Sequence, residues 1–306
     1  MQSGLRGQLL DLTLRSPDSS IYLLVDTTLG DPLANVATRA TAVAVPIRHP
    51  DLKHDHHPYL LRLGEIGRDP AIDTSLALGL AQALRSPESL ALGRSICLWL
   101  VSDSGIDVVA RHLAARARVR VGSETKLFRF WDPRVMDALE HLLRPMQAGS
   151  LLGPVSSCLW LTRSGSLATL RAVDAKSDEA VVDGLRLDQR QLDHLARVEL
   201  INRALDVLQD MARPVLGAEV RTVLGGLIEK GAREWTLRTD RELVTYAMYG
   251  VLVHQGFDRE PEVAEAMEQA RRAGMSPIDA LEQFDESYWQ ALAGKADGCA
   301  EAARTA

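Results

Sequence analysis

The sequence predicts an α/β N-terminal lobe, with a mixed sheet and flanking helices, followed by an all-helical C-terminal lobe. Apolar runs of strand length alternate with helix-spaced apolar positions as far as about residue 184, and beyond it only the helical spacing recurs. A chain of 306 residues is long enough to bury two cores. We therefore expect one domain over 1–184 and a second over 185–306.

Four apolar runs in the first half have the length of buried strands: 21–25, 41–47, 59–63 and 95–101. The last of them, Ser95-Ile96-Cys97-Leu98-Trp99-Leu100-Val101, is the longest continuous signal. A hairpin is expected at 157–162 and 167–170, because the turn-forming stretch 163–166 separates two further runs. Strands without polar alternation indicate a sheet that is covered on both faces.

Helices are expected between and after these strands. Asp73 is the expected cap of a helix through Leu84, and Ser104 is expected to open another. In the second half, helical spacing and Gly or Pro breaks predict helices at 187–211, 220–232, 240–253, 262–273 and 278–292. The pair Gly225-Gly226 lies inside one of them and suggests close helix packing or a kink.

Composition excludes several functional classes. The formal charge is −6 without a basic stripe, which argues against nucleic acid as a partner. No run of eighteen apolar residues exists and the N-terminus lacks a signal-peptide core, so we expect a cytoplasmic protein that does not enter a membrane. The three cysteines are far apart and fit a reducing compartment.

Two stretches resemble functional sites, and no catalytic triad is apparent. His49, Asp51 and 54–57 (His-Asp-His-His) resemble a metal cluster, but they lie in one Pro-bounded polar loop, so no metal is expected. The turn at 102–105 between a strand and a helix suits either an anion or, as we expect, a simple helix cap. No spacing links Ser, His and Asp into a triad, so neither an enzyme nor a cofactor is expected.

The stretch 126–134, Lys-Leu-Phe-Arg-Phe-Trp-Asp-Pro-Arg, holds three of the fourteen aromatic residues of the chain. Strand-forming residues precede Pro133, which cannot lie within a strand, and Asp132 is a good helix cap. We expect a strand through Trp131, with both phenylalanines on a buried side and Arg129 and Trp131 on the other.

Two roles are open for this motif. It is either a buried strand that leads into a capped helix, or a surface that contacts a partner. The candidate partner-binding residues share this one stretch and are Phe128, Arg129, Trp131, Asp132 and Arg134. A guanidinium near a core needs a carboxylate, so Arg129 is expected to pair with Asp132 or another acid.

The motif resembles the signature of the adaptor (chaperone) proteins that load toxic effectors onto the spike of the bacterial type VI secretion system. Four more segments are similar to that family in the same order: Tyr22–Asp26, Pro58–Leu63, the strand from Trp99 with His112-Leu113, and Ser150–Pro154. Segments 243–246 and 256–258 are similar to the helical tail of such proteins. The stretch 27–40 lacks the helix that is usual there.

This resemblance implies a non-enzymatic cytoplasmic adaptor of a bacterium. Its partners would be a cognate toxic effector and a spike protein or spike-capping protein, with no cofactor. Two alternatives are an immunity-type binding protein that neutralises a toxin and an α/β hydrolase built on the first lobe.

Overall fold

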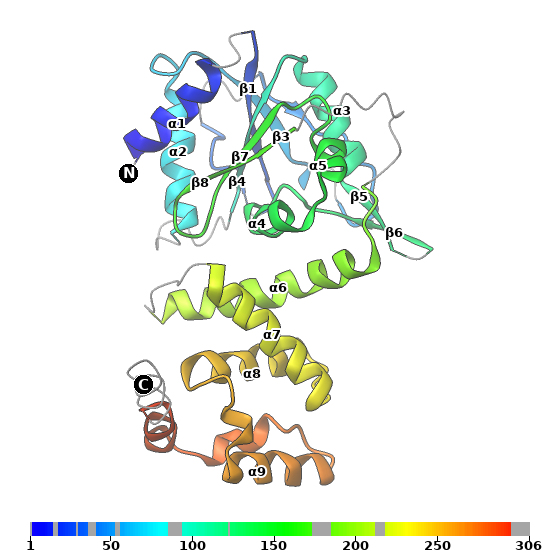
Figure 1. Cartoon of the computed structure of the whole chain (residues 1–306). Coiled ribbons are helices and arrows are strands. Elements are labelled where there is room, and N and C mark those ends of the chain that lie inside the picture. Colours follow the sequence, from blue (N-terminus) through cyan, green and yellow to red (C-terminus); the bar gives the residue numbers. More distant parts are fainter. Residues whose placement is uncertain are drawn as a thin grey trace. The chain divides into compact units, whose positions relative to one another are not determined.

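The computed structural model describes residues 2–14, 18–28, 30–35, 41–52, 56–84, 94–121, 123–172, 185–211 and 218–294. The chain divides into two compact units, Met1–Leu192 and Asp193–Ala306. The first holds a sheet with flanking helices and the second is helical where it is described, which confirms the predicted fold class (Figure 1).

The sheet of the first unit has six strands in the spatial order β2-β3-β1-β4-β7-β8. Its five ladders are antiparallel. A parallel bridge between Val119 and Leu185 lies outside them. The strand bounds are β1 Ser20–Val25, β2 Val43–Ala44, β3 Tyr59–Leu63, β4 Ile96–Ser102, β7 Ser157–Leu161 and β8 Leu167–Arg171.

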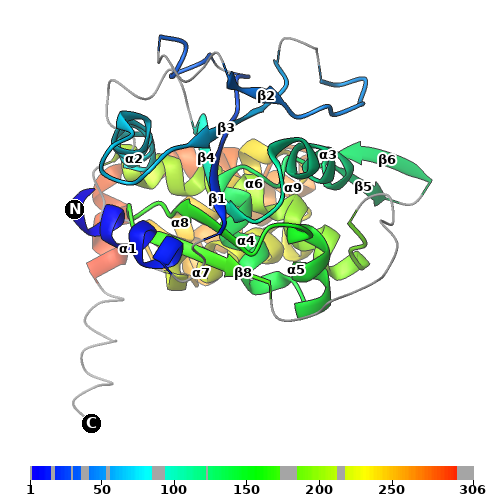
Figure 2. The ribbon, with the colours of Figure 1, turned by 90° about the horizontal axis from the view of Figure 1, so that it is seen from above.

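Helices cover both faces of this sheet. On one face α1 (Gln2–Leu14) and α2 (Pro70–Ala83) pack on the odd-numbered residues of β1, including Leu23, in a shared core. On the other face lie α3 (Ile106–Arg116), α4 (Pro133–Leu142) and α5 (Pro145–Leu152). Both views place α1 and α2 on one side and α3 and α5 on the other (Figure 1 and Figure 2). Burial on two sides explains why β1, β4 and β7 consist almost entirely of apolar residues.

Several local expectations for this unit were wrong. The cap of α2 is Asp69, whose side chain accepts from Ala71 N, because Pro70 provides a better first helical residue than the one after Asp73. The cap of α3 is Gly105 without a side-chain bond, since the Ser102 hydroxyl accepts from Ser104 N instead. Helices α1 and α5 and the ribbon of β5 (Arg118–Val121) with β6 (Glu124–Leu127) were not foreseen as such.

The second unit contains α6 (Gln189–Asp210) from Asp193 onward, α7 (Ala218–Glu234), α8 (Asp240–Leu252) and α9 (Pro261–Arg272). The short helices η4 (Phe257–Arg259) and η5 (Asp279–Gln283) follow α8 and α9. One continuous helix over 278–292 was expected, but the chain is extended at Phe284 and helical again over 286–294. The cause is Asp285, which accepts from Tyr288 N and so caps a new helix.

A buried carboxylate ties the second unit together. Asp258 of η4 accepts from Lys230 Nζ of α7 at 2.5 Å, from Trp235 Nε1 at 2.8 Å and from the Tyr246 hydroxyl of α8 at 2.7 Å. Burial acts to raise the pKa of Asp258, but these donors outweigh it and the pKa lies below its ordinary value. The core around it contains Leu224, Leu227 and fully buried Phe257.

No helix in the part of the chain that the structure describes is both long and apolar enough to cross a membrane.

Candidate partner-binding site

The motif at 126–134 is a turn between a ribbon and a helix rather than a strand. Strand β6 ends at Leu127, Phe128 N donates to Ala117 O, and Asp132 N donates to Arg129 O to close a turn. The prediction of a strand through Trp131 is therefore wrong, because pairing with β5 ends at Leu127. Asp132 caps α4, as predicted: its side chain accepts from Arg134 N, and Pro133 is the first helical residue.

Because residues 128–131 do not form a strand, successive side chains need not point to opposite faces. Phe128, Phe130 and Trp131 are all buried, and the rings of Phe130 and Trp131 meet edge to face at 5.5 Å. The prediction that both phenylalanines are buried is confirmed. The prediction that Trp131 lies opposite them is wrong, because the turn directs its ring into the protein.

Asp26, at the end of β1, binds this turn from 103 and 105 residues away. Its Oδ2 accepts from Arg129 Nη2 at 2.6 Å and from Trp131 Nε1 at 2.7 Å, while Oδ1 accepts from the backbone and hydroxyl of Thr28. Burial acts to raise the pKa of Asp26, but the Arg129 charge and these bonds outweigh it, so the pKa lies below its ordinary value. Arg129 thus pairs with an acid, as expected, and its partner is Asp26.

A second ion pair lies one residue further along. Arg134 donates through Nε and Nη2 to the two oxygens of Asp132, at 3.0 and 2.8 Å. Burial tends to raise the pKa of Asp132, but Arg134 and, more weakly, Arg94 keep it below its ordinary value. Arg94 is partly buried, and desolvation together with the nearby Arg163 lowers its pKa to about 10. It donates to Leu161 O and so ties this charged group to β7.

The five candidate residues divide by exposure. Phe128 and Trp131 are buried, and the Asp132 side chain is 17% exposed. The side chains of Arg129 and Arg134 are 44% and 34% exposed. A partner can therefore reach the two guanidinium groups, of which Arg129 is held by Asp26 and Arg134 by Asp132.

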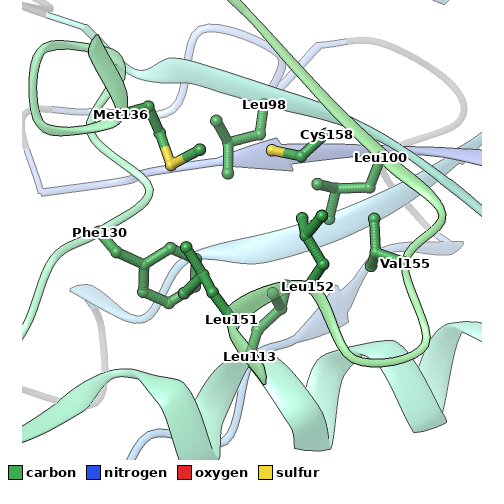
Figure 3. A pocket seen from close by; sticks show the side chains of 9 residues that line it. All are labelled: Leu98, Leu100, Leu113, Phe130, Met136, Leu151, Leu152, Val155 and Cys158. Atoms are coloured by element: carbon green, nitrogen blue, oxygen red, sulfur yellow. The ribbon is translucent and has the colours of Figure 1, made fainter. Parts of the chain in front are cut away.

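Behind the motif lies a small apolar cavity, to which Phe130 and Met136 contribute from the motif and α4 (Figure 3). Its volume is about 10 Å³, close to the space of one water, and its walls offer almost no polar partner. Cys158 lines it from β7, and burial raises the pKa of that thiol, whereas a nucleophilic cysteine needs a lowered one. The cavity is a packing defect of the core rather than a substrate pocket.

The loop at 49–57 and the turn at 102–105 make structural contacts where they are described. His49 contacts Thr125 O of β6 at 3.2 Å and Asp51 lies beside it. No group of three metal-ligating side chains occurs among the described residues, and His54 and Asp55 lie outside them. At the turn 102–105, the Ser102 hydroxyl donates to Pro154 O and accepts from Ser104 N, so it joins the turn to the end of α5.

Residues 21–150 match the family model described as a domain of unknown function, DUF4123. The matched segment is less than half of the chain and includes β1, β4, the motif and α4. No curated protein and no solved structure matches the chain.

Two residues of the DUF4123 segment that support the motif were not predicted to do so from the sequence. Asp26 was foreseen only as the end of a strand, and Arg94 was not singled out. An acid directly after the buried run Tyr22–Val25 was the available signal, because a carboxylate at the end of a covered strand needs donors from elsewhere in the chain. Arg94 precedes the strongest strand but follows residues without a clear pattern, and nothing nearby indicates that it joins a charged group around Asp132.

Proposed function

We propose that this protein is a non-enzymatic adaptor of the bacterial type VI secretion system, which binds a cognate toxic effector in the cytoplasm and delivers it to the spike or a spike-capping protein. The observation that carries the proposal is the DUF4123 match over residues 21–150, since this domain is known in effector adaptors of that system. The ordered similar segments, from Tyr22–Asp26 to Ser150–Pro154, support the same assignment.

The geometry of the motif supports a role in presenting charge to a partner. Arg129 and Arg134 each reach the surface in part while a buried or nearly buried carboxylate fixes the guanidinium. An arginine that is already ordered loses less side-chain entropy on binding than a free one, so pairs of this kind favour recognition of an acidic or carbonyl-rich partner surface.

The deciding experiment deletes the gene and compares export of the cognate effector with export of the tube protein. A dedicated adaptor is needed for its own effector alone, so we expect loss of that effector with normal tube export. Continued effector export, or arrest of the whole apparatus, contradicts the proposal.

A binding experiment separates the adaptor from an immunity-type protein. Purified protein is mixed with the effector divided into its targeting end and its toxic domain, without added metal or nucleotide. We expect binding to the targeting end, whereas an immunity protein binds and inhibits the toxic domain.

Arg129→Gln and Arg134→Gln test the motif within this assay, with Arg111→Gln as the control because Arg111 is exposed on α3. We expect weaker effector binding by about tenfold for the motif variants, which corresponds to one charge-assisted contact. Circular dichroism must show a folded protein for each variant. Unchanged binding by folded motif variants excludes the two arginines from the interface.

A further inference from the structure

A series of aromatic rings in the second unit runs from its core to its surface. Tyr246 and Phe257 are fully buried, and their ring centroids lie 5.1 Å apart. Tyr249 stacks on Phe257 at 5.6 Å and contacts Trp289 at 4.7 Å. Phe284 continues the series against Trp289 at 5.4 Å.

The outer end of this series remains partly exposed. It comprises Tyr249, Phe284, Tyr288 and Trp289, which we call the aromatic face. Tyr288 meets Trp289 edge to face at 5.4 Å, and Phe284 lies 4.6 Å from Tyr288, so the rings form one surface. The chain has only fourteen aromatic residues, and partly exposed, mutually packed Trp and Tyr rings are typical of protein-binding surfaces.

Acidic side chains surround the aromatic face. Residues 260–286 contain eight acidic residues and two arginines, an excess equal to the net charge of the entire chain, −6. Both arginines, 271 and 272, pair with Glu268. Glu262 interacts with the Tyr288 hydroxyl, and burial followed by this acid raises the pKa of that tyrosine.

Further acids are close to the other rings. Burial and the charge of Glu282 raise the pKa of Tyr249, which places this carboxylate within electrostatic reach of the ring. Glu262, Glu282 and Asp285 are all exposed. The electron-rich ring faces and the carboxylates therefore produce a negative potential on the same surface.

We propose that the aromatic face binds an arginine-bearing segment of a protein partner. A guanidinium stacks on Trp and Tyr rings and pairs with a carboxylate in two parallel bonds, so it satisfies both features at once. A second copy of the same acidic surface would be repelled. The segment 295–306 carries two acidic and two basic residues and lacks the net positive charge that the face selects. The proposal rests on the proposed function only for the identity of the partner.

The test uses the full-length protein and three short synthetic peptides that carry arginine, lysine or glutamate at every fourth position between leucines. Fluorescence anisotropy at low ionic strength measures their affinities. We expect binding in the order arginine, lysine, glutamate. Tyr288→Leu and the double variant Glu262→Gln/Glu282→Gln should each weaken the arginine peptide by about tenfold.

The matched control is Glu140→Gln/Glu219→Gln, which removes the same charge at two exposed positions outside the aromatic face, on α4 and α7. We expect less than about a twofold change for this control. An equal loss in the control means that only net charge matters and overturns the proposal. Equal affinities of the arginine and lysine peptides with no effect of Tyr288→Leu also overturn it, as does no binding at millimolar peptide.

Export in cells separates this proposal from the proposed function. A strain that carries Glu262→Gln/Glu282→Gln in place of the native gene should lose effector export as the deletion strain does. If the deletion blocks effector export but this variant exports the effector fully, the aromatic face is not needed for export. That result contradicts the proposed binding role of the aromatic face and leaves the adaptor role intact. Normal effector export in the deletion strain contradicts the adaptor role. The peptide affinities then test, on their own, whether the aromatic face binds arginine-bearing segments.

Discussion

At the scale of single residues, the motif depends on two kinds of burial. The Phe130 ring fills space between the sheet and the helices of one face, where it borders the apolar cavity. Asp26 instead places a charged carboxylate in the interior. Four hydrogen bonds donated to it offset the free energy lost on its desolvation.

Phe130→Ala should lower the free energy of unfolding by about 3–5 kcal/mol, because it removes a buried ring and enlarges an existing cavity. Urea denaturation of the purified variant measures the loss. The control is Met146→Ala, which removes a side chain that is 69% exposed and should change stability by no more than about 0.5 kcal/mol. A loss below about 1 kcal/mol for Phe130→Ala means that the ring is not part of the core.

Acid should destabilise the first unit through Asp26. Its folded pKa lies below the ordinary value of 3.8, so its contribution to stability is complete above about pH 3.8 and is lost as the pH falls through the folded value. Asp26→Asn should therefore be less stable than the native protein at neutral pH, with a difference that narrows below about pH 3.8. Urea midpoints over this pH range test it, and a difference independent of pH contradicts the assignment.

The sequence was informative about the composition of the motif and misleading about its geometry. Aromatic residues and a following Pro identified a buried stretch and the cap Asp132. Strand propensity predicted that the side chains of residues 128–131 alternate between two faces. The ladder with β5 stops at Leu127, however, and the propensity of a segment does not indicate where its partner strand ends. The contact with Asp26 depends on a pairing over about one hundred residues, which no local pattern contains.

At the scale of elements, α7 and α8 of the second unit approach each other closely at glycines, most closely at Gly250. A Cβ at Gly250 of α8 would lie 2.5 Å from Leu227 Cδ2 of α7, whereas a Cβ at Gly226 of the same α7 would meet no atom within 4 Å. The sequence suggested close packing at Gly225-Gly226, but a Cβ at Gly225 would only reach an ordinary contact with Ile201 at 3.5 Å. The closest approach is therefore at Gly250 of α8, and on α7 it is Gly231, not Gly225 or Gly226, that packs tightly, with its Cβ position 3.0 Å from Tyr246 Cδ1.

Gly250→Ala should destabilise the second unit, because α7 and α8 must separate or Leu227 must leave its place. Gly226→Ala should stabilise it by about 0.5–1 kcal/mol, since alanine favours a helix interior and meets open space. Thermal unfolding of both variants measures the difference. Equal midpoints for the two contradict the packing described for Gly250.

Strands and long helices of the fold could be read from the sequence more reliably than short elements. The apolar run at 95–101 and the helical spacing at 187–211 reappear as β4 and α6 with ends shifted by two residues or fewer. Helices α1 and α5 were missed because the first lies in a stretch read only for a signal peptide and the second spans eight residues. The break at Phe284 was missed because Asp285 reads equally well as a surface residue.

At the scale of the whole molecule, the two units have cores that share no residue in the clusters described, one within Leu5–Leu161 and one within Ile201–Leu292. Asp258→Asn should therefore act on the second unit alone. It leaves Lys230 without its charged partner in a largely buried position, and a loss of about 3–5 kcal/mol is expected.

Hydrogen exchange with mass spectrometry measures the spread of this effect. Amides in α7, α8 and η4 should exchange faster in Asp258→Asn, while those in β1 and β4 keep native protection. Faster exchange throughout the sheet indicates that the two units unfold together and contradicts this expectation.

Two carboxylates, one in each unit, receive an indole N–H together with a cation: Asp26 with Trp131 and Arg129, and Asp258 with Trp235 and Lys230. Of the other three tryptophans, Trp99 and Trp160 donate to Ser75 and Asp137. In a nitrogen-edited NMR spectrum the indole groups give a handful of signals outside the crowded amide region. The Trp131 and Trp235 signals therefore serve as separate natural reporters, one for each unit, of a partner that loosens or tightens it.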